Sequence, residues 1–258
     1  MFTLLLVRIP RPPETAAGKA GRGSLRREAG YGWVYLKERP GLLGLLVLFA
    51  FINFALGYFS VLMTPLVLSF STADVLGAIF SVGGIGTLIG SVVMSTWGGS
   101  KRKIDGLLGS IFLFSVFLIL MGFRADLVVI GIGAFGLFVL LPIAQASSQS
   151  IWQAKIAPDV QGRVFAIRGL IAQGITPLTY LTAGPLADYV FEPMMQPNGA
   201  LASSVGAVIG VGVGRGIGLI FVVMGLFIAL ATAIGYAMPR IRRVEEELPD
   251  YGADMPKE

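Results

Sequence analysis

The sequence lacks both cysteine and histidine. Their absence excludes disulfides, thiolate and imidazole metal sites, cysteine nucleophiles and every Ser-His catalytic pair. The chain also has no Gly-rich loop ending in Gly-Lys-Ser/Thr and no Asn-Pro pair, which argues against an ATP-driven domain and a six-span water channel. We therefore expect no enzyme activity, no catalytic residues, no cofactor and no metal.

Charged residues are also scarce. They make up 14% of the 258 residues, against 55% hydrophobic residues, and the mean hydropathy is +0.78. This composition is too apolar for a water-soluble domain of this length and predicts an integral membrane protein. The net charge of +5 comes from basic residues that flank apolar runs, so it indicates contact with anionic lipid and not with nucleic acid.

Six apolar runs are long enough to cross a bilayer as helices, because about 20 residues span a hydrocarbon core of about 30 Å. They cover residues 41–66, 74–97, 104–123, 127–151, 164–190 and 217–238. The alternating pattern of a membrane barrel is missing. The predicted fold class is therefore all-α integral membrane, with six transmembrane helices.

The same pattern divides the chain into three regions. Residues 1–40 are expected to hold the end of a preceding helix, at residues 1–7, and a cytoplasmic loop with an amphipathic segment at 25–39. Residues 41–240 form the six-helix transmembrane domain, and residues 241–258 a disordered cytoplasmic tail. All of the 20 lysines and arginines except Arg124 and Arg215 then fall on one side, which predicts that both termini are cytoplasmic.

Polar side chains inside the runs are the candidates for a substrate cavity, because they are costly in a bilayer and often functional. They are Asn53 in the first run, Gln145, Ser148 and Gln149 in the fourth, and Gln173, Thr176 and Tyr180 in the fifth. Spacings of three and four residues give the fourth and fifth runs one polar stripe each. Hydrogen bonding between helices is the alternative interpretation.

Other residues suggest packing and control. Gly86 and Gly90 form a small-xxx-small pair, which indicates a close helix contact or an interface that slides. Asp159 and Arg163 lie four residues apart, on one helical face, and are candidates for a gating latch; ordinary interface charges are the alternative. No acidic residue lies in the middle of a run, so Asp188 and Arg215, at the rims, are the candidates for ion coupling.

Four stretches are more specific than composition. They are residues 28–46 (EAGYGWVYLKERPGLLGLL), 97–107 (WGGSKRKIDGL), 157–168 (APDVQGRVFAIR) and 183–193 (AGPLADYVFEP). They resemble the carboxy-terminal six-helix half of a major facilitator superfamily transporter, near the drug and macrolide efflux-like and siderophore-exporter branch. The loop at 97–107 departs from the family pattern, because Ser100 stands where an acid is usual and Asp105 comes later, so we expect no acid-to-base latch there.

The resemblance implies secondary active efflux of a small amphipathic solute by alternating access, in a bacterial inner or plasma membrane. It makes Lys101, Arg102 and Lys103 candidates for gating. The implied partners are the lipid bilayer, a small-molecule substrate and an amino-terminal six-helix half on the same or a separate chain, or a homodimer mate. A structural or channel-like six-helix module without active transport is the alternative function.

Overall fold

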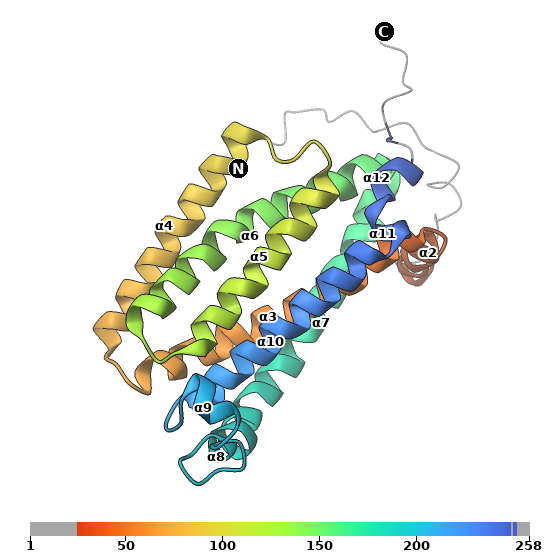
Figure 1. The fold of residues 1–258 in the computed structure, drawn as a ribbon. Coiled ribbons are helices and arrows are strands. Elements are labelled where there is room, and N and C mark those ends of the chain that lie inside the picture. The colour runs from red at the N-terminus through yellow and green to blue at the C-terminus, as the bar shows by residue number, and fades with distance from the viewer. Residues whose placement is uncertain (1–24, 249, 252–258) are drawn as a thin grey trace, which may run out of the picture.

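The computed structural model describes residues 25–248, 250 and 251, which form helices and no strand. Six helices are long and apolar enough to cross a membrane, and Figure 1 shows them as one bundle. They are α3 (Pro40–Leu68), α4 (Ala73–Trp97), α5 (Lys103–Phe123), α6 (Leu127–Lys155), α7 (Pro158–Leu186) and α10 (Arg215–Ala237). The prediction of an all-α integral membrane protein with six spans is confirmed. The expected helix end at residues 1–7 lies outside the described residues.

Shorter elements complete the chain. They are α2 (Leu25–Lys37), the π-helical turn η2 (Ala187–Phe191), α8 (Glu192–Met194), α9 (Val205–Ile209), α11 (Pro239–Arg242) and α12 (Val244–Glu247). The fifth span begins at Pro158, earlier than the predicted residue 164, and continues through η2 and α8. Pro158 fits this first turn because proline lacks the N–H that would have no helical partner there.

The six spans do not enclose one another equally. α5 packs between α6 and α10, α4 packs on α6, and α3 packs on α7 and α10. Half of the apolar window of α3 is buried, but only 11% of the window of α7. α7 is therefore the least enclosed span, and its surface must meet lipid or another protein surface.

The contact between α4 and α6 depends on glycine. A Cβ atom added at Gly90 would lie 2.1 Å from the Val139 carbonyl oxygen, and one added at Gly86 would lie 2.8 Å from the Phe135 carbonyl oxygen. The two helix backbones thus approach closely along this pair of glycines. The predicted close helix contact is confirmed, and its role as a sliding interface stays a prediction.

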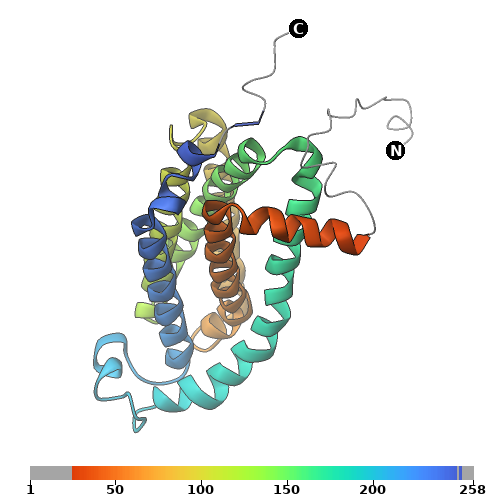
Figure 2. The same cartoon turned by 90° about the vertical axis from the view of Figure 1, so that its right-hand side faces the viewer.

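The helix α2 crosses the bundle near one end, at a steep angle to the long helices (Figure 2). Its inner side buries Tyr35 and Leu36 completely, and its outer side exposes Trp33 and Val34. It packs on α7 and α3, within the stretch predicted to be amphipathic.

The C-terminal segment differs from the predicted disordered tail. Residues 239–247 form α11 and α12, and the side chains of Ile241 and Val244 are buried against the bundle. The prediction was wrong for this part because it weighed the polar composition and missed these two apolar anchors. Residues 249 and 252–258 lie outside the described residues.

Candidate functional site

A cavity of about 320 Å³ lies between α3, α6 and α7, and we call it the α3–α6–α7 cavity. Its lining consists of Leu46, Phe49, Ala50, Asn53, Gln145, Gln149, Phe165, Arg168, Gly169, Ile171 and Ala172. These residues lie about 6 to 14 positions from the nearer ends of their helices, at Pro40, Lys155 and Pro158, which at about 1.5 Å per residue is roughly 10–20 Å deep. The cavity therefore lies within the membrane-spanning part of the helices.

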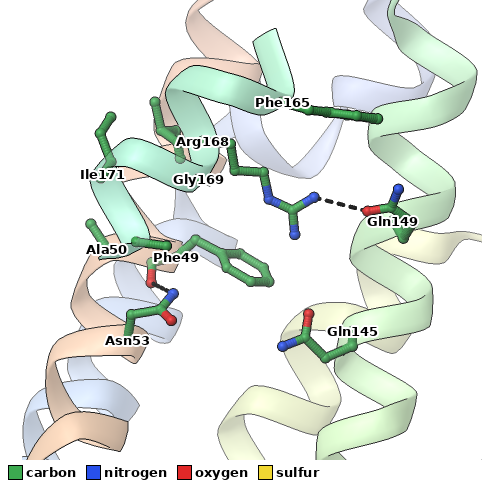
Figure 3. Close-up of a pocket in the computed structure, with 11 residues that line it drawn as sticks. Phe49, Ala50, Asn53, Gln145, Gln149, Phe165, Arg168, Gly169 and Ile171 are labelled. Carbon is green, nitrogen blue, oxygen red and sulfur yellow. Dashed lines mark hydrogen bonds between the residues drawn. The ribbon is translucent and has the colours of Figure 1, made fainter. Parts of the chain in front are cut away.

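Arg168 is the central polar group of this cavity. Its Nη1 donates a hydrogen bond to Gln149 Oε1 and its Nη2 donates one to Ser148 Oγ, each at 3.1 Å. The guanidinium carbon also lies 4.8 Å from the centre of the Phe49 ring and 5.3 Å from that of Trp152. Figure 3 shows the side chain reaching from α7 across the cavity toward Gln149 on α6.

The positive charge of Arg168 has no acidic partner among the described residues. No acidic residue lines the α3–α6–α7 cavity, and no ion pair among the described residues includes Arg168. Its hydrogen-bond acceptors are an amide and a hydroxyl, which bear no charge. An arginine at membrane depth is costly, so this arrangement favours a function that needs the charge.

The structure brings four of the seven predicted cavity residues together. Asn53, Gln145 and Gln149 line the α3–α6–α7 cavity, and Ser148 lies fully buried behind it as an acceptor for Arg168. The Asn53 amide donates to the Phe49 carbonyl oxygen at 2.7 Å within α3.

The remaining three predicted residues lie elsewhere on α7. Gln173, Thr176 and Tyr180 are exposed and do not line the α3–α6–α7 cavity. The two predicted stripes therefore do not face one space within this chain. The stripe on α7 is instead an exposed polar surface on the least enclosed span.

Sequence reasoning missed Arg168 as a site residue, because it counted this arginine among the cytoplasmic charges that set orientation. The structure places it more than two turns inside α7, which begins at Pro158. A signal was available, since residue 168 falls inside the apolar run predicted at 164–190. A charged residue inside a span is a functional candidate by default.

The gating candidates lie at the end of the bundle where α2, α11 and α12 gather. Arg102 Nη2 donates to the Arg242 carbonyl oxygen at 2.9 Å and lies 3.2 Å from Glu246 Oε1. Lys103 Nζ donates to the Gly98 carbonyl oxygen at 2.6 Å, and Lys101 is exposed.

The other two gating candidates belong to α7. Asp159 lies in its first turn, and the guanidinium of Arg163 lies 5.9 Å from the centre of the Tyr31 ring on α2. These contacts place Asp159 and Arg163 beside the crossing helix α2. Their role as a latch stays a prediction.

The coupling candidates Asp188 and Arg215 do not form an ion pair within the described chain. Asp188 is exposed on η2, whereas Arg215 is buried and donates from Nη2 to the Gly122 carbonyl oxygen at 2.7 Å. Glu192 is the acid near Arg215, and its carboxylate accepts backbone hydrogen bonds from Gly214 and Ile217 at 3.1 Å. Glu192 thus caps the start of α10.

The site has neither a metal-binding cluster nor a second polar cavity beside it among the described residues. The described residues hold no group of three or more acidic side chains that could bind a metal ion. A larger groove of about 410 Å³ between α3 and α10 is lined by apolar residues and glycine, which suits lipid acyl chains.

Comparison of the chain with protein-family models, curated proteins and solved structures gave no match.

Proposed function

We propose that this chain forms one six-helix half of an alternating-access transporter for a small amphipathic solute. The observation that carries the proposal is the α3–α6–α7 cavity, which combines amides, an arginine and aromatic rings inside the membrane-spanning region. Such mixed lining suits a solute that has both an apolar and a polar part. The resemblance of four stretches to the major facilitator superfamily supports the same interpretation.

A second six-helix unit fits the exposed face of α7. Gln173 and Thr176 are exposed on this helix, and polar groups that face lipid are costly. In a major facilitator-type assembly the cavity forms between two halves. We therefore propose that the partner half, or a second copy of the chain, packs over α7. The positive-inside distribution of charge supports a cytoplasmic location for both termini.

Single-cysteine labelling tests alternating access, because the chain has no native cysteine. Ala172→Cys lines the cavity, and Asn198→Cys, at an exposed position in the loop between α8 and α9, is the control outside it. Each variant is treated with an impermeant maleimide in right-side-out and inside-out vesicles. The labelling is done with and without a small amphipathic test solute, either 2-naphthoate or its neutral amide.

A transporter predicts that Ala172→Cys is labelled from both sides and that solute changes the two rates in opposite directions. The rates for Asn198→Cys should not respond to solute. Labelling of Ala172→Cys that solute leaves unchanged would contradict alternating access and favour a channel-like or structural module.

A further inference from the structure

We infer that the α3–α6–α7 cavity selects an organic anion: a carboxylate that pairs with Arg168 and carries an apolar body that packs on the aromatic wall. This inference rests on the proposed function and specifies its substrate class. Three properties of the site carry it, namely the open donors of Arg168, the missing counter-charge and the shape of the apolar lining.

The guanidinium keeps donors for a ligand. Arginine has five N–H groups, and the hydrogen bonds to Gln149 and Ser148 occupy one on Nη1 and one on Nη2. The described residues give Arg168 no other hydrogen bond, so three of its N–H groups have no protein acceptor, and the residue lines the cavity. Arg168 therefore presents unused donors to the cavity while its two protein contacts hold the side chain in place.

The charge of Arg168 also calls for an anion. Its neighbours in the cavity are amides, a hydroxyl and rings, which stabilise the cation without neutralising it. A planar guanidinium matches a carboxylate with two parallel hydrogen bonds, and such charge-assisted bonds are roughly twice as strong as neutral ones. A neutral solute would forgo this pairing, and a cationic solute would be repelled.

The remaining lining fits an apolar body beside the anionic group. Phe49, Phe165, Leu46 and Ile171 form the apolar part of the wall, and the Phe49 ring lies directly beside the guanidinium. The volume of about 320 Å³ is at the small end of ligand cavities, which are about 300–1,000 Å³. A compact aromatic or short branched acid is therefore the appropriate size.

The experiment compares 2-naphthoate with 2-naphthamide, which has the same ring system and no charge. The purified chain is placed in phosphatidylcholine nanodiscs, and binding is measured by titration calorimetry. Trp152 fluorescence gives a local readout in a Trp33→Phe/Trp97→Phe background, because the Trp152 ring lies next to Arg168. Arg168→Gln and Arg168→Lys test the guanidinium, and Arg124→Gln, at an exposed arginine outside the cavity, matches the change in charge.

We expect the wild-type chain to bind the carboxylate about 10-fold or more tightly than the amide, as the pairing of close opposite charges predicts. Arg168→Gln should remove most of this preference and leave amide binding within about 2-fold, whereas Arg168→Lys should keep part of it. Arg124→Gln should bind both compounds as the wild type does. Equal wild-type affinities for the two compounds would overturn the inference, and this comparison needs no variant to fold.

A second arm separates a free acid from an anionic lipid headgroup, which offers similar chemistry. Replacing the nanodisc lipid with phosphatidylglycerol should weaken 2-naphthoate binding only by the few-fold that a negative surface potential imposes on any anion, and should leave binding of the neutral 2-naphthamide unchanged. Loss of binding of both compounds in that lipid would assign the site to a headgroup and overturn the inference of a free solute. The binding result is independent of transport. Anion selectivity without solute-dependent labelling of Ala172→Cys would retain the anion site and reject the transporter. Solute-dependent labelling without anion selectivity would retain the transporter and reject the anion site.

Discussion

The Glu245 carboxylate accepts a hydrogen bond of 2.9 Å from the backbone N–H of Ile104, which lies 141 residues earlier in the chain. Its other oxygen accepts one of 3.0 Å from the N–H of Lys103. Both donors belong to the first turn of α5, where N–H groups have no helical partner. An acid of the C-terminal segment thus caps a transmembrane helix.

This contact supplies the acidic group that the basic loop at residues 97–107 lacks before its lysine and arginine cluster. Ser100, and not an acid, stands directly before Lys101, and the structure supplies Glu245 and Glu246 from α12 instead. Lys155 strengthens the arrangement, because its buried ammonium group donates to the carbonyl oxygens of Glu245 and Leu248 and lies 2.8 Å from Asp250. The C-terminal segment therefore ties the loops on both sides of the α5–α6 pair.

Glu245→Ala should lower stability by about 1 kcal/mol, the usual cost of losing a helix N-cap. For a protein of this size that is a fall in melting temperature of roughly 2–4 °C. The measurement is thermal unfolding of the purified chain in detergent. Glu247→Ala is the control, because Glu247 is an exposed acid of the same short helix. Equal melting temperatures for wild type and Glu245→Ala would show that the cap does not contribute.

The sequence predicted the spans well because each is a long apolar run, and that property does not depend on the neighbours of the run. It did not predict the folding of residues 239–247, since two buried side chains, Ile241 and Val244, decide it against a polar background. The candidate site was predicted only in part for the same reason. Spacing placed Gln145 and Gln149 on one face, but only packing shows that Arg168 reaches Gln149 and that the exposed Gln173 does not line the cavity.

Gly90→Ala should destabilise the contact between α4 and α6. The new methyl group would meet the Val139 carbonyl oxygen, and overpacking of this kind costs about 1–3 kcal/mol. Gly84→Ala is the matched control on the same helix, because a Cβ atom there meets nothing within 4 Å. We expect a lower melting temperature for Gly90→Ala alone. A similar decrease in both variants would indicate a general effect of glycine on α4.

Alkaline pH should weaken the docking of α2. Burial raises the pKa of the Tyr35 phenol above its ordinary value of 10.0, so the folded state favours the neutral form. The stability that this preference contributes is fully present below pH 10 and is lost as the pH rises above 10. Tyr35→Phe should therefore lose less melting temperature between pH 9 and pH 11 than the wild type. Tyr180→Phe, at a residue 60% exposed, is the control and should lose as much melting temperature as the wild type. An equal loss in Tyr35→Phe would exclude the Tyr35 phenol as the cause of the alkaline destabilisation.

The asymmetry of lysine and arginine predicts the orientation of the chain in the membrane. Asn198, in the loop between α8 and α9, and Glu247, on α12, are both exposed, and these elements lie at opposite ends of the bundle (Figure 1). In intact cells an impermeant maleimide should label Asn198→Cys, and Glu247→Cys should react only after permeabilisation. The reverse pattern would invert the topology.

The polar stripes on α6 and α7 should differ in their contribution to solute binding. Gln145 and Gln173 are both exposed glutamines on long helices, but only Gln145 lines the α3–α6–α7 cavity. A typical hydrogen bond contributes a net of about 0.5–1.5 kcal/mol, which is roughly 2- to 12-fold in affinity. Gln145→Ala should therefore weaken binding of 2-naphthamide to the purified chain by about 2-fold or more, and Gln173→Ala should leave it unchanged.

Thermal unfolding of the same two variants completes the test, because a packing role would lower stability together with binding. We expect both to melt as the wild type does, since neither side chain is buried. A matching loss of affinity in Gln173→Ala would mean that the binding region extends along the outer surface of α7. Unchanged affinity in Gln145→Ala would remove this amide from the site and leave recognition to Arg168 and the aromatic wall.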